Sequence, residues 1–387
     1  MRHTQHNLPA RIAEIRALVK LSQAQLAMKL GVSTSLVSHW EKGTRTPSGT
    51  QLLTLAQHVG VTLDYLLNAT VRPHFKFRAQ KTSPQHDAIE RSLLDASLQV
   101  HFVHTAFRLA EKTPKPFSLR ADFDSFAALP NITTNFRQTL KLNRRVTLDE
   151  LKQALAEWNI FVFDWCMPWH LSGLSFRGPF TVIFINHEHS TARRLFTLAH
   201  EFAHVVFHLD RKTLQTKEPD DTVVSIASNR DPIEKQANAF AAELLMPRAD
   251  LEQLVKSFGS RLRDPACLEA VAQQFNVSRD AIFYRLTQLD VFRWTEKSTY
   301  FVGNYTPPPA PAHRVEHHEK IDRQVDPRFR DLALSLHQAD KISTGKLAEW
   351  FFAPRHVMEE YLTELSRAKE NAISDGPNHE EELAAAD

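Results

Sequence analysis

The sequence predicts a multidomain, mainly α-helical protein whose central α+β domain contains a small antiparallel or mixed sheet. Three observations lead to this fold class. The first 70 residues contain short apolar segments with helical spacing. Residues 160–185 contain segments rich in β-branched and aromatic residues, as strands are. Residues 193–209 form an apolar run without Pro or Gly, which favours a buried helix.

Composition limits the class of protein. A chain of 387 residues, 42% of them apolar, is long enough for two or three domains with hydrophobic cores. The formal net charge is only +2, so any affinity for nucleic acid has to come from local basic patches. The chain starts with polar residues and contains no run long enough to cross a bilayer, so we expect no membrane segment. Cys166 and Cys267 lack the spacing of a cysteine-type zinc site and fit a reducing cytoplasm.

The N-terminal region is predicted to be a bundle of five helices. Apolar residues recur at helical spacing in the first helix. Ser22 is placed to cap the second helix and Gly31 to end it. A three-residue turn leads into the third helix. The predicted helices are Arg11–Leu21, Gln23–Leu30, Ser33–Glu41, a segment from Thr46-Pro47-Ser48 through Val59, and Thr62–Leu67.

The second and third helices, with the short turn between them, resemble the Xre/Cro/CI-type helix-turn-helix domain. This resemblance implies that the third helix enters the major groove of double-stranded operator DNA and that a homodimer reads two half-sites. Residues 1–70 contain 7 Lys and Arg against 3 Asp and Glu, a net charge of +4. A protein-interaction bundle is the alternative. We expect base contacts from Thr34, Ser35, Ser38 and His39, phosphate contacts from Gln23, Lys42 and Arg45, and a structural role for Glu41.

The segment 200–204 reads His-Glu-x-x-His within the apolar run. Positions i and i+4 lie on one face of a helix, so His200 and His204 can reach a single cation. Glu201 lies beside them, where it can act as general base toward an attacking water molecule. Because the apolar flanks predict a buried helix, these polar groups need partners, and a metal ion supplies them.

A third ligand is expected from a second helix downstream. Asp231 is a plausible N-cap and Pro232 suits the first helical position. Glu234 lies in the first turn as the candidate ligand, and Asn238, four residues later, is placed to hydrogen-bond one of the histidines. Glu243 is the rival carboxylate. His208 is expected to point away from the metal, because Phe207 stands where a longer zinc pattern needs a glycine.

Phe196–His204 together with Ala237–Pro247 resemble the ImmA/IrrE family of metallo-endopeptidases, over roughly residues 147–290. The resemblance implies a zincin-like domain in which His200, His204 and Glu234 bind Zn²⁺ and Glu201 is the catalytic base. Mn²⁺ or Fe²⁺ would fit the same ligands. It also implies cleavage of a repressor protein in a stress or mobile-element response.

Three segments upstream of this motif are predicted strands: 160–163, 171–176 and 180–185. Phe180–Asn186 is our candidate for an edge strand that binds substrate by strand addition, with a plain core strand as the alternative. His187 and His189 directly follow this segment. They are either ordinary surface residues or groups that stabilise the oxyanion of the tetrahedral intermediate.

The predicted domain organisation has six parts. Residues 256–300 resemble the winged-helix pair that follows the catalytic helices in this family, with Gln273, Gln274, Ser278, Arg279 and Arg285 on its polar face. The parts are 1–70, the DNA-binding head; 71–146, a basic connector with one helix near Asp87–Lys112; 147–255, the zincin-like core; 256–300; 301–320, a Pro-rich linker; and 321–387, a helical region with a hairpin-like unit at Ser343–Leu365 and a disordered acidic tail.

Two functions fit these predictions. The first is a transcriptional regulator whose zinc endopeptidase domain cleaves a repressor, a partner or the chain itself. The alternative is an operator-binding antitoxin or immunity repressor, paired with a toxin, whose zinc domain is a non-proteolytic scaffold or sensor.

Overall fold

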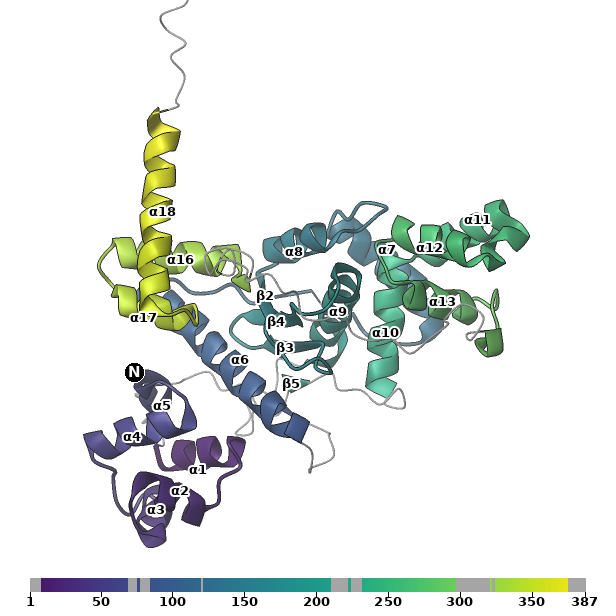
Figure 1. The fold of residues 1–387 in the computed structure, drawn as a ribbon. Helices are drawn as coiled ribbons and strands as arrows, with labels where there is room; N and C mark the ends of the chain where they lie inside the picture. Colours follow the sequence, from purple (N-terminus) through teal and green to yellow (C-terminus); the bar gives the residue numbers. More distant parts are fainter. Residues whose placement is uncertain are drawn as a thin grey trace, which may run out of the picture.

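The computed structural model describes residues 8–68, 75–76, 84–119, 121–209, 222–223, 232–296, 321 and 324–374. The described part confirms a multidomain, mainly helical chain with a small mixed sheet (Figure 1). The predicted N-cap Asp231, the Pro-rich linker and the acidic tail lie outside the described residues. Within the described residues, no helix combines the length and the apolar composition needed to cross a bilayer.

The N-terminal bundle has the five helices that the sequence predicts. Its second and third helices are short, and the second is capped as expected. The Ser22 hydroxyl accepts a hydrogen bond from the Gln25 amide, and Gly31 ends the helix with φ 64°, a left-handed value that favours glycine. Ser33 caps the following helix in the same way. The helices are α1 (Leu8–Leu18), α2 (Gln23–Leu30), α3 (Thr34–Glu41), α4 (Gly49–Val59) and α5 (Leu63–Asn68).

The central sheet has the strand order β2-β4-β3. Strand β2 (Ile160–Trp165) runs parallel to β4 (Thr181–Asn186), and β3 (Gly173–Arg177) runs antiparallel to β4. The expectation that Phe180–Asn186 forms an edge strand is therefore wrong, because β4 lies in the middle and β3 at the edge. A separate parallel pair, β1 (Phe75–Lys76) and β5 (Thr222–Val223), lies against β3.

Both faces of the sheet are covered, and alternate residues of its strands enter two different hydrophobic clusters. On one face Phe163 and Phe184 pack with α6 (Pro84–Leu109) and the C-terminal helices. On the other face Val162 and Ile183 pack with the helices of the peptidase-like domain. This arrangement explains why the paired strands β2 and β4 are largely apolar on both faces.

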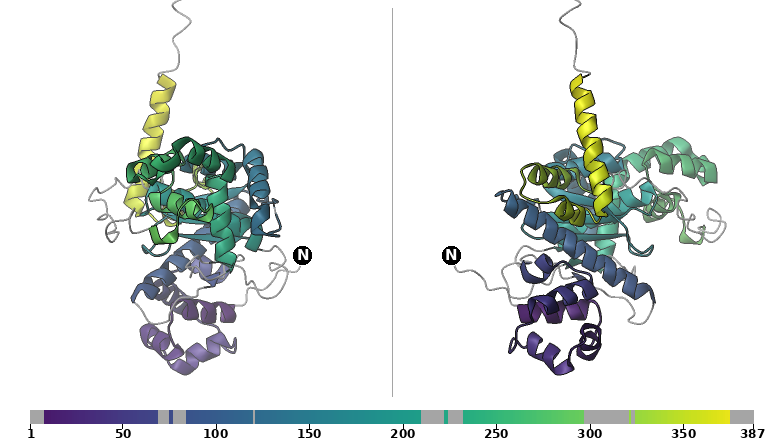
Figure 2. Two further views of the ribbon diagram at one scale, coloured as in Figure 1. Left: turned by 90° about the vertical axis from the view of Figure 1, so that its right-hand side faces the viewer. Right: turned by 60° about the vertical axis from the view of Figure 1, so that its left-hand side comes forward.

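The helices on the second face include α9, which carries the His-Glu-x-x-His segment and packs against the sheet. They are α7 (Leu129–Thr139), α8 (Leu148–Glu157), α9 (Thr191–Ala203), the π-helical turn η2 (His204–His208), α10 (Pro232–Leu245), α11 (Arg248–Phe258), α12 (Pro265–Gln274) and α13 (Arg279–Gln288). Short 3₁₀ turns are η1 (Phe126–Ala128), η4 (Gly259–Arg263) and η5 (Trp294–Glu296). Figure 2 shows α11 to α13 gathered at one end of the molecule.

The predicted connector is more deeply built into the fold than the sequence suggests. Its helix, α6, runs diagonally between the DNA-binding head and the sheet and is buried along most of its length (Figure 1). The buried His101 of α6 contacts Asp64 of α5, with 3.0 Å between His101 Nε2 and Asp64 Oδ2. Phe117 and Phe136, also from the connector region, belong to the hydrophobic cluster of the peptidase-like domain. The connector therefore joins the two modules rather than holding them apart.

The C-terminal helices α16 (Pro327–Gln338), α17 (Thr344–Trp350) and α18 (Arg355–Ser374) pack on α6 and on the outer strand β2. Asp326, which is buried, accepts a hydrogen bond of 2.9 Å from the Val162 amide of β2 and forms an ion pair with Arg328. The predicted hairpin-like unit corresponds to α17 and the first part of α18; α16 precedes it. The rest of α18 projects beyond the body in both figures.

We predict that Asp326→Ala lowers the free energy of unfolding by about 2–3 kcal/mol, because it leaves the buried Val162 amide without an acceptor. Urea titration followed by tryptophan fluorescence measures the change. Asp331→Ala is the matched control, since its side chain is 67% exposed and its carboxylate forms an ion pair with the neighbouring Arg330. Equal stability of Asp326→Ala and wild type would contradict this account of the docking.

Candidate metal centre

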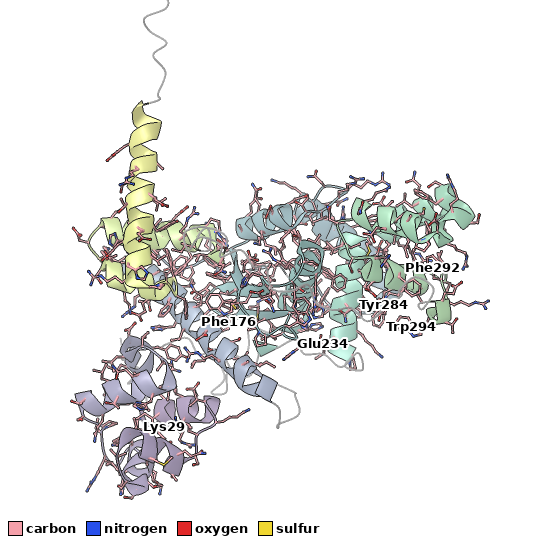
Figure 3. All side chains as sticks on the ribbon, viewed as in Figure 1. Lys29, Phe176, Glu234, Tyr284, Phe292 and Trp294 are labelled. Atoms are coloured by element: carbon pink, nitrogen blue, oxygen red, sulfur yellow. The ribbon has the colours of Figure 1, made fainter. Side chains whose placement is uncertain are left out.

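The centre is formed where α10 crosses α9. Ser190 caps α9 by accepting a hydrogen bond from the Arg193 amide, and the helix buries its apolar side against the sheet and against α10. Ala199 and Ala203 on α9, and Ala237 and Ala241 on α10, are fully buried, and their small side chains allow the two helices to approach closely. Figure 3 shows Glu234 near the end of α10 that faces the sheet.

The structure brings together the three ligands proposed from the sequence. His200 Nε2 lies 3.0 Å from His204 Nε2 and 3.2 Å from Glu234 Oε2. His204 Nε2 lies 3.6 Å from Glu234 Oε1. All three side chains are buried. Two imidazoles and one carboxylate that converge in this way are a typical ligand set for zinc and leave a coordination position for water.

The ring nitrogen of His200 that faces away from the centre is held by the expected residue. His200 Nδ1 lies 2.9 Å from Asn238 Oδ1. Because an amide oxygen only accepts, Nδ1 carries the proton, and the lone pair of Nε2 is directed to the centre. The position of Asn238, one helical turn after Glu234, is what makes this contact possible.

His204 is oriented by a contact that the sequence analysis missed. His208 Nδ1 lies 3.0 Å from His204 Nδ1, and His208 Nε2 lies 3.0 Å from Gln236 Oε1. The proton on His208 Nε2 is donated to the Gln236 oxygen, so His208 Nδ1 accepts the proton of His204 Nδ1. The lone pair of His204 Nε2 therefore also faces the centre. His208 is not among the converging ligands, yet it contacts one of them, because η2 widens the helix into a π-helical turn.

Glu201 lies beside the ligands and against the edge strand β3. Within the described residues, neither of its carboxylate oxygens has a hydrogen-bond partner, although the side chain is fully buried. Burial raises the pKa of Glu201 to about 7, against the opposing effects of the neighbouring His200 and of the Ser175 hydroxyl, which lies nearby without forming a well-aligned hydrogen bond. A buried carboxylate without partners is unusual, and a water molecule bound at the centre would satisfy it.

Strand β3 passes so close to Glu201 that only glycine fits at its first position. A Cβ atom on Gly173 would lie 2.7 Å from Thr197 Cγ2 and 2.8 Å from Glu201 Cγ. The sequence analysis did not select Gly173. The signal was present, because a glycine inside a strand often marks the close approach of another group.

The charges of the ligands are balanced within the cluster. Burial alone would raise the pKa of Glu234, but the neighbouring imidazoles of His200 and His204 outweigh it and lower the pKa well below its usual range. Burial lowers the pKa of His204 to about 4, so this imidazole is neutral at pH 7. A neutral imidazole beside an ionised carboxylate is the protonation state that metal binding requires.

Glu243, the rival ligand, serves a different purpose. Its side chain forms an ion pair with Arg285 of α13 and accepts a hydrogen bond of 2.9 Å from the Arg248 amide. Both partners of the ion pair are buried. The expectation that Arg285 lies on a polar outer face is therefore wrong, because it packs inward to neutralise Glu243.

His187 and His189 are not among the converging ligands. His187 contacts Glu188 instead, with 2.9 Å between His187 Nε2 and Glu188 Oε1. The oxyanion role considered for either residue stays a prediction. His189 is buried, and its Nε2 donates to the Trp169 carbonyl oxygen at 2.8 Å.

Most of the proposed DNA-contacting residues of the N-terminal bundle are exposed. Thr34, Ser35 and His39 of α3, with Lys42 and Arg45 after it, are exposed, whereas Ser38 and Gln23 are half-buried. Glu41 forms an ion pair with Arg16 and accepts a hydrogen bond of 2.7 Å from Gln23. This agrees with the structural role expected for Glu41 and ties Gln23 to the fold. Lys29, at the end of α2, marks this module in Figure 3.

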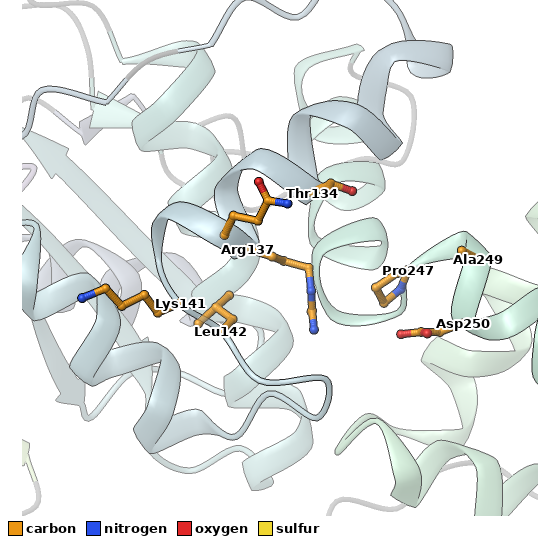
Figure 4. Close-up of a pocket in the computed structure, with 8 residues that line it drawn as sticks. Thr134, Arg137, Lys141, Leu142, Pro247, Ala249 and Asp250 are labelled. Atoms are coloured by element: carbon orange, nitrogen blue, oxygen red, sulfur yellow. The ribbon is translucent and has the colours of Figure 1, made fainter.

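A surface hollow of about 480 Å³ lies between α7 and the start of α11 (Figure 4). Arg137 crosses beneath it and donates to the Leu244 carbonyl oxygen of α10. None of the residues that line the hollow belongs to the metal centre. It is lined by Thr134, Arg137, Gln138, Lys141, Leu142, Pro247, Ala249 and Asp250.

Comparison with known families agrees with both modules. Residues 12–66 match the helix-turn-helix family model, and residues 162–287 match the model of the IrrE N-terminal-like domain, a metallopeptidase family. No curated protein matches the chain. The protein is thus a regulator-type chain that contains a DNA-binding head and a metallopeptidase-like domain. More particularly, it joins a helix-turn-helix domain to a domain of the ImmA/IrrE type, a family that implies a divalent metal.

We predict that His208→Leu lowers the affinity of the centre for Zn²⁺ by about 10–100-fold, because His204 loses the acceptor that orients its ring. Competition with a chromophoric chelator measures this affinity without any substrate. His208→Gln keeps an acceptor for the His204 proton. We expect its Zn²⁺ affinity to lie between those of His208→Leu and wild type. His58→Leu, at an exposed position of α4, is the control. Unchanged zinc affinity in His208→Leu would show that His204 needs no such support.

Proposed function

We propose that this protein is a DNA-binding transcriptional regulator whose ImmA/IrrE-type domain is a zinc endopeptidase. The main support for this proposal is that a cluster of metal-ligand side chains and an unpaired carboxylate lie side by side. Three buried ligands converge, and beside them the carboxylate of Glu201 lies within the core with no hydrogen-bond partner among the described residues. A site that only stabilised the fold would not need this fourth, costly group.

The chain's own residues supply most of the proposed chemistry. His200, His204 and Glu234 would hold the ion, which when bound acts as a Lewis acid toward water and toward the peptide carbonyl group. Glu201 takes the proton of the attacking water and later passes it to the departing amine. With its pKa near 7, Glu201 is suited to both accepting and releasing a proton close to neutral pH.

Zinc is the metal that we propose, because two imidazoles and one carboxylate suit its preference for nitrogen and oxygen ligands with an open position. Mn²⁺ and Fe²⁺ fit the same donors. Elemental analysis of the purified protein distinguishes the three ions.

The edge strand β3 is the proposed substrate-binding element, in place of β4. It runs past Glu201, and among the described strands it hydrogen-bonds only to β4. An extended segment of a protein substrate would add to its outer side through backbone hydrogen bonds. Glu201 and His204 are fully buried, and β5 lies against β3. We therefore infer that cleavage is slow until a signal or a partner opens this side.

The head would direct this activity to a genetic locus. A single helix-turn-helix module reads one half-site, so we propose that the protein binds its operator as a homodimer. The proposed substrate is a repressor, a partner protein or the chain itself, cleaved in a stress or mobile-element response in the cytoplasm. An antitoxin that binds a toxin partner without proteolysis is the alternative outcome of the experiments below.

We predict that Glu201→Gln abolishes cleavage while metal content stays equal to wild type, because the amide cannot accept the proton. New protein N-termini in stressed cells that express either protein are identified by mass spectrometry. Glu252→Gln, on the exposed side of α11, is the matched control. The same new termini in the Glu201→Gln cells, with metal bound, would overturn the mechanism. Absence of new termini in both, again with metal bound, would favour the non-proteolytic alternative.

We predict that Arg45→Ala weakens DNA binding about uniformly across sequences and reduces the slope of log affinity against log salt by about 1, because one phosphate contact is lost. Fluorescence anisotropy with a duplex from the promoter of the protein's own gene, and with an unrelated duplex, measures both quantities. Lys256→Ala is the control, because it removes an exposed positive charge outside the DNA-binding head. An unchanged salt slope for Arg45→Ala would place the DNA on another surface.

A further inference from the structure

A second group of metal-ligand side chains lies at the carboxyl ends of β2 and β4. These strands are parallel neighbours, and their last paired residues are Trp165 and Asn186. Cys166 and His187 therefore leave the sheet side by side. The His187 amide still donates to the Trp165 carbonyl oxygen at 3.1 Å, so the pairing continues one residue beyond the strands. Parallel pairing thus brings together two residues that are remote in the sequence.

The backbone around these residues is held in place by one buried side chain. The side-chain nitrogen Nδ2 of Asn186 donates to the carbonyl oxygens of Met167, Pro168 and Leu171, at 3.0, 3.1 and 2.9 Å. Its oxygen accepts a hydrogen bond of 3.1 Å from the Glu188 amide. Asn186 therefore fixes the loop that carries Cys166 and the turn that carries His187 and Glu188 relative to each other. A preorganised backbone of this kind is what a metal site requires.

Three different donor groups meet on this framework. One ligand atom each from Cys166, His187 and Glu188 lies within 4.8 Å of the other two. His187 Nε2 lies 2.9 Å from Glu188 Oε1, and His187 Nδ1 is buried with no hydrogen-bond partner among the described residues. Thiolate, imidazole and carboxylate together favour a borderline transition-metal ion such as Zn²⁺ or Co²⁺ over Mg²⁺ or Ca²⁺.

This group is separate from the centre formed by His200, His204 and Glu234. The two share no residue: one group precedes the start of α9 at Thr191, and two ligands of the other belong to the last turn of α9 and the turn that follows it. Cys166 is exposed, whereas the ligands of the other centre are buried. An ion in solution can therefore reach the second group without any opening of the fold, and water can complete its coordination.

We propose that Cys166, His187 and Glu188 form a second metal site, one that binds a divalent transition-metal ion at the surface. The residues next to the proposed ligands connect this site to two other parts of the fold. Trp165, which precedes Cys166, packs against Phe352 in the turn between α17 and α18, with 5.1 Å between ring centroids. Glu188 stands two residues before Ser190, the N-cap of α9. A bound ion would tie the end of β2 to the start of the helix that carries the catalytic motif.

Cobalt titration of the full-length, reduced protein tests this site. Thiolate ligation gives Co²⁺ an intense near-ultraviolet charge-transfer band, and the centre of two histidines and a glutamate, which has no sulfur ligand, cannot produce it. We expect wild type to bind about two Co²⁺ ions per chain and to show the band. Cys166→Ser is expected to lose the band and one ion, and His187→Ala to weaken the band-forming site at least about tenfold.

Two controls separate this site from the other centre and from adventitious binding. Cys267→Ser removes the other cysteine, which lies on α12, and is expected to keep the band. Glu234→Ala is expected to bind one ion fewer and also to keep the band, so the result does not depend on the proposed peptidase centre. A band that is absent from wild type with reduced thiols, or that persists in Cys166→Ser, would overturn the proposal. So would a band unaffected by His187→Ala.

Discussion

The rest of the structure depends on the burial of His200, His204, Glu201 and Glu234 where α9 meets α10. Such groups are costly in a core unless each is paired or binds a metal. The surrounding sequence meets this requirement step by step: small alanines bring the helices together, Asn238 and the neighbouring His208 hold the outer ring nitrogens, and glycine brings β3 against Glu201. Of these four groups, Glu201 alone keeps both oxygens without a hydrogen-bond partner among the described residues, which is why we propose it as the reactive group.

A second constraint comes from the sheet, which is buried on both faces. Its outer cluster includes residues of the head, of α6 and of the C-terminal helices. The contact between Asp64 and His101 places the DNA-binding module directly on α6, and Lys346 of α17 lies 3.9 Å from the same aspartate. The head, the connector helix and the C-terminal helices therefore meet at one carboxylate, while the metal centre occupies the opposite side of the sheet.

Much of this arrangement could be predicted from local patterns. The five helices of the head follow from apolar spacing and from caps such as Ser22, because caps and periodicity act within a few residues. The same holds for the His-Glu-x-x-His segment and for the spacing between Glu234 and Asn238. Long-range pairing could not be predicted in this way. Phe180–Asn186 is apolar at nearly every position, and that pattern does not tell an edge strand from a central one. Arg285 has an ordinary polar sequence environment, yet it is buried against Glu243.

The sequence by itself determined the groups on which the proposed chemistry rests: the proposed ligands and their helical spacing, the proposed general base and the helix-turn-helix pair, because each depends on residues within one or two helical turns. Only the tertiary structure decided how these groups are completed. His208 supports His204 because a π-helical turn and Gln236 of another helix place it there. Cys166 lies beside His187 because two strands pair in parallel. Both contacts depend on how segments that are distant in the sequence pack together, and no local sequence pattern encodes this packing.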